Sequence, residues 1–366
     1  MPYKCQCPSQ RIKTHNLKVR SMFKACDGRG TTKIFLSIIY TKIPHQICQH
    51  SQHSTPICRS GKCEIHRKCS LMSSLALTPF KAGLFVGKSI IVTGGGTGLG
   101  YAIAKELVSL GAKVVIAARR IEVLEAAASE MNKSSQRGGK IYVCQCNVRN
   151  EDDIQKLVTF ALETMGGIDG LVNNAGGQFV SPVENISARG FKAVVETNLL
   201  SCFMLSKEIY NRWWSQQEDR KRSGSIVNII LANKNGFPMM AHSGAARAGV
   251  ENLTKSMALE WIGRGVRVNC VAPGIIYTES GFANYGEMAG AFLSSVLPCI
   301  PAHRCGTAEE VSSLVVFLLS DAAVYITGQN MGVDGGMGQG TIPLRPQDHG
   351  ASLLPVYGEL PMKARL

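Results

Sequence analysis

The sequence predicts an α/β fold in which one doubly wound parallel sheet carries helices on both faces. Three observations lead to this prediction. A glycine-rich turn joins a short β-branched run to a helical stretch within residues 89–110. Apolar runs and amphipathic stretches then alternate along the chain, which is the pattern of repeated strand–helix units. The composition also changes near residue 72, so we expect the fold to begin there, after a disordered extension.

The positive charge of the chain is concentrated at its N-terminus. The 366 residues have a formal net charge of +14, but residues 1–71 account for +11 and residues 72–366 for only +3. A nucleic-acid or membrane-surface function of the whole protein is therefore not indicated. No apolar run approaches the roughly 18 residues of a membrane span. We divide the chain into an extension (1–71), a folded domain (72–340) and a flexible C-terminal arm (341–366).

The N-terminal extension is rich in cysteine and histidine but predicts no metal site. Cys58, Cys63, His66 and Cys69 have the spacing C-x4-C-x2-H-x2-C, which matches no common zinc motif. The segment also lacks the Arg-rich amphipathic helix of a transit peptide. We interpret it as disordered, or as sequence upstream of a start at Met72. The six cysteines beyond residue 72 fall mostly in apolar runs, which favours reduced thiols.

The glycine-rich turn Gly94–Gly100 predicts a dinucleotide site of the Rossmann type. It follows a strand expected at 89–93 and precedes a helix expected at 101–110 and a second strand at 113–118. Glycines let the backbone approach a pyrophosphate, and a helix N-terminus supplies free N–H groups and a positive dipole end. The strand–turn–helix–strand context makes a cofactor site the favoured interpretation of this turn.

The end of the second strand indicates which dinucleotide binds. An NAD site carries an acidic residue there for the ribose 2′-hydroxyl, whereas a 2′-phosphate requires a cation. The sequence reads Ala117-Ala118-Arg119-Arg120, without an acid. The guanidinium of Arg119 can bond a phosphate through two N–H groups and stack on adenine. NADPH is therefore the expected cofactor.

Further strand–helix units extend the sheet. Strands are expected at 141–147, 170–175, 224–230, 267–272 and 329–333, with helices at about 150–166, up to Arg212, at about 243–262 and at about 308–320. In doubly wound sheets, ligands bind at the carboxyl ends of the strands. We expect Asn147, Asn174–Gly176 and Pro273–Thr278 to converge with the glycine turn at that edge.

Together these residues resemble the short-chain dehydrogenase/reductase family over roughly residues 80–345. Thr93-Gly94-x3-Gly98-x-Gly100 is similar to its cofactor turn, Asn173–Gly176 to its fourth-strand motif and Asn269-x3-Pro273-Gly274 to its sixth strand. The resemblance implies a homo-oligomer and an active-site role for Asn198. It also implies that the cofactor contacts Thr93, Gly94, Thr97, Gly98, Leu99, Gly100, Arg119, Asn147, Asn174, Ala175, Gly176, Pro273, Gly274 and Ile276.

The catalytic segment departs from the family pattern, which usually has Tyr-x3-Lys and an earlier serine. An ungapped register places Ser243 at the Tyr position and Arg247 at the Lys position, and residues 228–232 contain no hydroxyl. A 3-ketoacyl or alcohol dehydrogenase is therefore not favoured. We expect Asn198 and Ser243 near the substrate carbonyl. Arg247, one helical turn from Ser243, is expected to hold the cofactor ribose.

The passage 173–285 is similar to the peroxisomal trans-2-enoyl-CoA reductases of this family. A tyrosine presumed to be their acid stands where this chain has Glu251, and we interpret that position as not catalytic. The resemblance implies NADPH-dependent reduction of the 2,3-double bond of trans-2-enoyl-CoA, in chain elongation or branched acyl-CoA metabolism. Residues 279–301 would form an acyl lid. The alternatives are a 2,4-dienoyl-CoA reductase, a non-catalytic NADP-binding scaffold and a nucleic-acid binder.

The last three residues, Ala364-Arg365-Leu366, resemble the Ser-Lys-Leu signal that a peroxisomal import receptor reads. Residues 341–360 are rich in Pro and Gly, so we expect a flexible arm that presents the tripeptide. The expected location is the peroxisome, and the expected partners are acyl-CoA and the import receptor. No nucleic acid, membrane span or metal is expected.

Overall fold

The computed structural model describes residues 25–26, 32–33, 78–133, 135, 137–218, 224–232, 236–283, 288–339, 355, 358–361 and 364. The chain divides into two units, Met1–Lys62 and Cys63–Leu366, each considered by itself. In the first, β1 (Ala25–Cys26) pairs antiparallel with β2 (Thr32–Lys33). Cys58, Cys63, His66, Cys69 and Met72 lie outside the described residues. Among the described helices, none has the length and hydropathy to cross a membrane.

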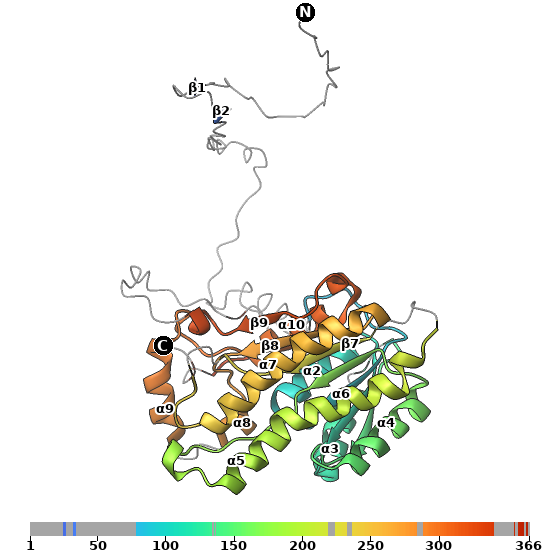
Figure 1. Ribbon diagram of the computed structural model, residues 1–366, viewed down its shortest axis with the longest axis horizontal. Helices are drawn as coiled ribbons and strands as arrows, with labels where there is room; N and C mark the ends of the chain where they lie inside the picture. Colours follow the sequence, from blue (N-terminus) through green and yellow to red (C-terminus); the bar gives the residue numbers. More distant parts are fainter. Residues whose placement is uncertain are drawn as a thin grey trace, which may run out of the picture. The chain divides into compact units, whose positions relative to one another are not determined.

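The second unit is built on a seven-stranded parallel sheet of order β5-β4-β3-β6-β7-β8-β9 (Figure 1). Its strands are β3 (Ser89–Thr93), β4 (Lys113–Ala118), β5 (Lys140–Gln145), β6 (Gly170–Asn173), β7 (Ser225–Ile229), β8 (Arg267–Pro273) and β9 (Asn330–Val333). From β3 the chain first builds outward through β4 and β5, then returns to β6 on the other side of β3. The predicted doubly wound parallel sheet is confirmed.

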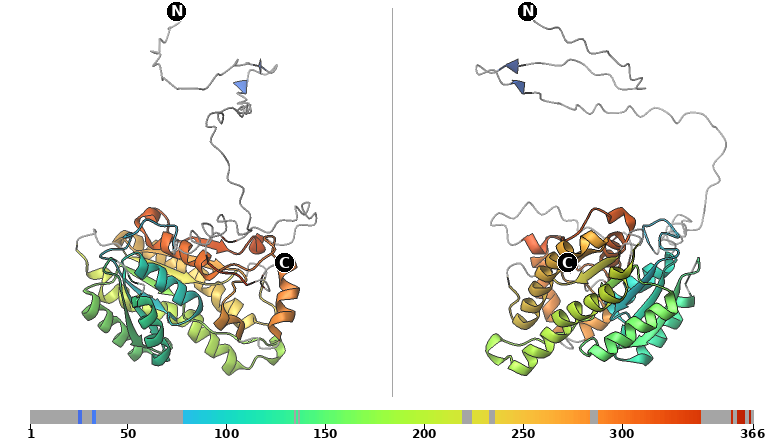
Figure 2. Two further views of the ribbon diagram at one scale, coloured as in Figure 1. Left: turned by 180° about the vertical axis from the view of Figure 1, so that it is seen from behind. Right: turned by 45° about the vertical axis from the view of Figure 1, so that its right-hand side comes forward.

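The helices cover both faces of this sheet (Figures 1 and 2). They are α2 (Gly98–Ser109), α3 (Ile121–Lys133), α4 (Glu151–Met165), α5 (Ala188–Val195), α6 (Ser201–Arg212), α7 (Ala241–Trp261), α8 (Glu279–Ala283), α9 (Met288–Val296) and α10 (Ala308–Leu319). A π-helical turn, η2 (Glu196–Leu200), joins α5 to α6. Such turns interrupt helices frequently at functional sites.

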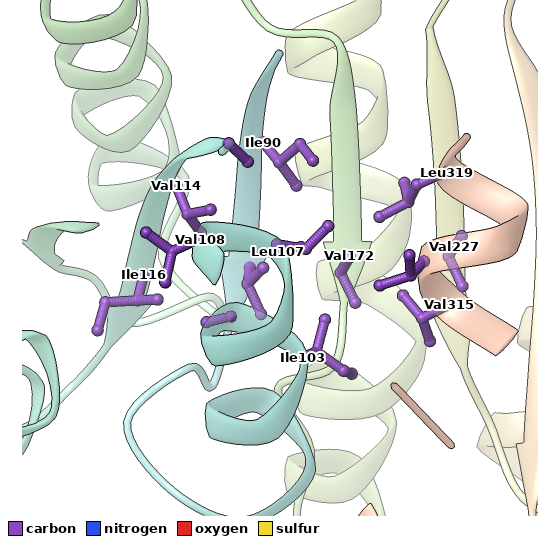
Figure 3. Packing of buried hydrophobic residues seen from close by; sticks show 14 of the residues in the cluster. Ile90, Ile103, Leu107, Val108, Val114, Ile116, Val172, Val227, Val315 and Leu319 are labelled. Atoms are coloured by element: carbon purple, nitrogen blue, oxygen red, sulfur yellow. The ribbon is translucent and has the colours of Figure 1, made fainter. Parts of the chain in front are cut away.

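Two apolar cores fix the helices on the sheet. On one face, α2 and α10 pack together against the strands through residues such as Ile103, Leu107 and Val315, as Figure 3 shows. On the other face, α4, α6 and α7 bury a second cluster that includes Leu157 and Leu205. Every residue of β3, β6, β7 and β8 is buried, because helices cover these strands on both sides.

The helix boundaries and the connecting segments differ in places from the sequence prediction. The helix after the glycine turn begins at Gly98 rather than at residue 101, since the N–H of Tyr101 already bonds the carbonyl of Thr97. Helices α3, α5, α8 and α9 were not assigned from the sequence. The last two lie within the expected lid, residues 279–301, which is therefore helical over much of its described length.

The C-terminal segment contacts the folded domain at the positions that the structure describes. Leu360 and Ala364 are buried in one cluster with Leu293, Leu297 and Ile300. The N–H of Cys305 donates to the carbonyl of Ala364 at 3.1 Å. We expected this arm to be flexible throughout. At these positions it is packed instead, because its apolar side chains complete the cluster around α9. Arg365 and Leu366 lie outside the described residues.

Close backbone approach in the glycine turn leads to a stability prediction. A Cβ at Gly100 would overlap the carbonyl of Gly94 and the Asn174 amide, neither of which can move without breaking the turn. We expect Gly100→Ala to lower the free energy of unfolding by about 1–3 kcal/mol in urea denaturation. Gly263→Ala is the matched control, because a Cβ there meets nothing within 4 Å, and we expect a change within about 0.5 kcal/mol. Equal stabilities of the two variants would contradict this account of the turn.

Candidate active site

The glycine turn lies where the sheet reverses its strand order, between β3 and β6. Gly94 and Gly98 have φ angles of +68° and +56°, which L side chains rarely adopt. The side chain of Thr97, the residue before α2, makes no capping hydrogen bond, and the first turn of α2 contains no acid. The N-terminal N–H groups of α2 therefore keep their positive end available to an anion.

Buried hydrogen bonds tie this turn to the neighbouring strand. The hydroxyl of Thr93 accepts from the backbone N–H groups of Asn174 and Ala175, both at 3.0 Å, and donates to the carbonyl of Val172 at 3.3 Å. The side-chain amide of Asn174 donates back to the Thr93 carbonyl at 2.9 Å. Thr93, Gly94, Asn174 and Ala175, all predicted to be cofactor residues, are thus brought together.

The remaining predicted cofactor residues border the same edge. Arg119 follows β4 and is exposed, and Asn147 follows β5 and is half-buried. On the other side, the N–H of Gly274 donates to the Val333 carbonyl at 3.0 Å, and Ile276 forms a bridge with Gly306. A Cβ at Gly98 would come within 3.0 Å of Ser280 in α8. The turn after β8 therefore borders the glycine turn.

These residues fit a dinucleotide. Gly94, Gly98 and Gly100 provide a backbone cradle that side chains would fill, and α2 directs its free N–H groups there. The exposed Arg119, at the end of β4, is suited to an additional phosphate. When bound, a nicotinamide dinucleotide supplies hydride chemistry, which none of these side chains can provide.

Asn198 lies within the π-helical turn η2 and is fully buried. Its carboxamide exchanges two hydrogen bonds of 2.9 Å with the backbone N–H and carbonyl of Gly177. It also accepts from Nη2 of Arg247 at 3.4 Å. Asn198 thereby fixes the loop that follows β6. A side chain at Gly176 would overlap Arg247 and approach Asn198, so this loop must begin with glycine.

Arg247 is a buried cation on α7 without an acidic partner among the described residues. Its guanidinium donates to the Ile229 carbonyl and to Asn198, while Nε has no hydrogen-bond partner. Burial lowers the pKa of the guanidinium below its ordinary value, although an arginine still remains protonated. A buried charge held only by neutral groups is costly, so an unpaired Nε indicates that a further acceptor completes this site.

Ser243 is fully buried one turn before Arg247, and its hydroxyl donates to Oε1 of Gln178 at 2.7 Å. The loop 176–178 thus connects the serine on α7 with Asn198 on η2. The structure brings Asn198, Ser243 and Arg247 together as predicted. Sequence analysis missed Gln178, because the glutamine is 65 residues from Ser243 and follows no local pattern.

Glu251 does not belong to this group. One carboxylate oxygen pairs with Lys255 at 2.9 Å, and the other accepts from Asn330 of β9 at 2.9 Å. Two turns along α7 from Ser243, its side chain is engaged with groups that contact neither Asn198 nor Arg247. The position at which similar reductases carry a tyrosine therefore holds an ion-paired carboxylate here.

A second residue that the sequence analysis missed is His242, next to Ser243. Its side chain is fully buried. The ring of Phe179 lies against it with the centroids 4.3 Å apart. Burial lowers the pKa of His242 below its ordinary value of 6.5, so the imidazole is neutral near pH 7.

Comparisons with known proteins agree with this geometry. Residues 94–338 match the model of a family described as enoyl-(acyl carrier protein) reductase. A zebrafish peroxisomal 2,4-dienoyl-CoA reductase is 38% identical over 67% of this chain and 79% of its own length. A probable 2,4-dienoyl-CoA reductase of Bacillus subtilis is 36% identical over 68% and 96%. A short chain dehydrogenase structure from Bacillus anthracis aligns at 36% identity and a TM-score of 0.62, covering 70% and 99%.

The buried imidazole leads to a prediction about stability in acid. The unfolded chain protonates His242 below about pH 6.5, whereas the folded chain does so only at lower pH. The free energy of unfolding therefore falls as the pH drops through this interval. We expect the free energy of unfolding of His242→Leu, measured by urea denaturation, to fall less between pH 7.5 and pH 5.5 than that of the wild type. His303→Asn, which removes a half-buried histidine, is the control. The explanation is wrong if both variants keep the full acid sensitivity.

Proposed function

The chain belongs to the short-chain dehydrogenase/reductase family, and on this premise we propose that it reduces the 2,3-double bond of trans-2-enoyl-CoA with NADPH. The observation that carries the proposal is the buried group of Ser243, Asn198 and Arg247 beside the cofactor cradle, with a serine instead of a tyrosine. Reducing a ketone requires an acid strong enough to protonate an alkoxide. Reducing a conjugated double bond requires a polarised thioester carbonyl and a proton for Cα, which water can supply.

The reaction uses these residues in a simple way. Hydride addition at Cβ moves the double-bond electrons onto the thioester oxygen, and Cα then takes a proton from water. The Ser243 hydroxyl, which donates to Gln178 without substrate, is the donor that would turn to the thioester oxygen. Asn198 keeps the loop 176–178 in place, and Arg247 would hold the nicotinamide ribose through N–H groups that Ile229 and Asn198 do not use.

NADPH is proposed over NADH because of Arg119. Its backbone carbonyl is fixed by the side-chain amide of Gln145 at 2.9 Å, so the position after β4 is well defined while the guanidinium is exposed. A 2′-phosphate there would gain a charge-assisted hydrogen bond, and no acid follows β4 to favour a 2′-hydroxyl.

A second candidate is reduction of 2,4-dienoyl-CoA, which the names of the zebrafish and Bacillus relatives favour. Both substrates present a thioester conjugated with a double bond. They differ in the carbon that takes the hydride, which is Cβ in the enoyl substrate and Cδ in the dienoyl substrate, so a site that polarises the thioester carbonyl is compatible with either. A non-catalytic NADP-binding scaffold is the remaining alternative. Oxidation of NADPH by the full-length protein with each substrate separates the three functions.

We also propose a peroxisomal location and a homo-oligomeric state. The zebrafish relative is peroxisomal by name, and the chain ends in Ala364-Arg365-Leu366, which resembles an import signal. Binding of the C-terminal tripeptide by an import receptor would deliver the folded enzyme. Loss of punctate fluorescence after deletion of these three residues would support the assignment.

The roles of the α7 residues can be tested by substitution. We expect Ser243→Ala to lower kcat on trans-2-enoyl-CoA about 10²–10³-fold, because one donor to the developing oxyanion is lost. Arg247→Met should mainly raise the KM for NADPH, with partial recovery in Arg247→Lys. Glu251→Gln should change turnover by less than about threefold, since this carboxylate pairs with Lys255. Loss of turnover in Glu251→Gln, with full activity in the other variants, would overturn the proposed register.

The cofactor preference is tested at the end of β4. We expect Arg119→Ser to raise the KM for NADPH about 10–100-fold and to leave the KM for NADH nearly unchanged, because a charge-assisted hydrogen bond contributes about 1.5–3 kcal/mol. Lys156→Ser removes an exposed cation on α4 and serves as the control. Equal effects of Arg119→Ser on both dinucleotides would show that this residue does not read the 2′-phosphate.

A further inference from the structure

Five large apolar side chains are exposed on the segments that flank the Ser243 group. Three come from the loop after β6 and the short helix that ends it, one from α5 and one from the turn before α7. Their exposed fractions lie between 41% and 63%. We call Phe179, Val180, Val183, Phe191 and Met239 the acyl surface. Water-exposed apolar side chains concentrated in this way usually mark a binding site.

The acyl surface is continuous, because its segments are tied to one another. The N–H of Ser181 donates to the carbonyl of Met239 at 2.8 Å, which joins the loop after β6 to the turn before α7. A Cβ at Gly190 would lie 2.9 Å from the ring of Phe179, so this ring rests on the backbone of α5. Loop, helix and turn therefore present one surface.

The acyl surface is adjacent in sequence to the hydrogen bond between Gln178 and Ser243. Gln178 accepts the hydrogen bond of the Ser243 hydroxyl, and Phe179 is the next residue. The same Phe179 ring covers His242, which precedes Ser243 on α7. A thioester bound at Ser243 would have this apolar surface directly beside it, on the side of the loop after β6.

The segment expected to hold the acyl chain offers no comparable surface. Leu293, Leu297 and Ile300 are buried against one another and against Leu360. Within residues 279–283 and 290–301, no large apolar side chain is among the exposed ones. Figures 1 and 2 place α8 and α9 at the same end of the sheet as α5. The apolar side chains at Leu293, Leu297 and Ile300 are thus buried in packing, whereas those of the acyl surface remain exposed by 41–63%.

We propose that the acyl surface binds the fatty acyl chain of the substrate and sets the preference for chain length. This proposal rests on the proposed function, because it identifies the acyl-CoA by its thioester at Ser243. Each methylene group that leaves water for an apolar surface improves binding by up to about fourfold. A medium or long acyl chain that reaches the acyl surface therefore binds more tightly than a four-carbon chain that does not reach it.

The test introduces a charge at the exposed edge of the surface, away from the reacting group. Val183→Asp and Phe191→Asp are compared with wild type in kcat/KM for trans-2-dodecenoyl-CoA and for crotonyl-CoA. We expect a loss of about tenfold or more on the twelve-carbon substrate and less than twofold on the four-carbon substrate. Val324→Asp is the matched control, because Val324 is 66% exposed, Val183 is 63% exposed, and Val324 lies outside the acyl surface.

Unchanged kinetics on the long substrate, or equal losses on both, would overturn the proposal. Calorimetry measures the affinity of the same variants for dodecanoyl-CoA and butyryl-CoA, which are not reduced. This measurement tests binding of the acyl chain independently of the reaction. If the wild type reduces neither enoyl substrate, but Val183→Asp weakens dodecanoyl-CoA binding about tenfold and butyryl-CoA binding less than twofold, the proposed function fails and the acyl surface stands. If dodecanoyl-CoA binds wild type and Val183→Asp equally, the acyl surface is wrong.

Discussion

The hydroxyl of Thr93 makes the contact on which the rest of the site depends. It accepts from the backbone N–H groups of Asn174 and Ala175, which directly follow β6, and donates to the carbonyl of Val172 within β6. These three bonds are formed in a buried position at the point where the strand order reverses, so leaving them unmade would be costly. They position Thr93, which directly precedes the glycine turn, and the backbone of residues 172–175, which leads to Gln178. Thr93 thereby connects the glycine turn to the loop after β6.

A cationic side chain in an almost fully buried position is the second constraint. Among the described residues, Arg247 is compensated only by a carbonyl and a carboxamide, and its Nε has no acceptor there. A ligand that supplies an acceptor removes part of this cost, so binding and folding stability are coupled at this residue. His242, buried against the ring of Phe179, lies one residue from Ser243 in the same helix.

The sequence predicted the sheet and much of the site because both follow local patterns. The run Ser89–Thr93, the glycine turn and the spacing from Ser243 to Arg247 can be recognised within a few residues. Gln178, His242 and the packed C-terminal residues could not be recognised in this way. Their environments depend on partners tens of residues away, such as Ser243 for Gln178 and Phe179 for His242. Helix α3 was missed although its buried residues follow helical spacing, at Leu124, Ala127, Ala128 and Met131.

The described residues of the C-terminal segment pack against α9, which would affect the proposed recognition of the C-terminal tripeptide by an import receptor. The carbonyl of Ala364 accepts from Cys305, and Leu360 is buried beside α9. A receptor that recognises the last three residues only when they are detached has to compete with this packing. Its apparent affinity is then reduced by the fraction of molecules in which the segment is released. By reciprocity, a bound receptor would favour a domain whose α9 cluster lacks two of its members. Binding of the tripeptide by a receptor and packing of Leu360 and Ala364 against α9 would therefore be thermodynamically coupled.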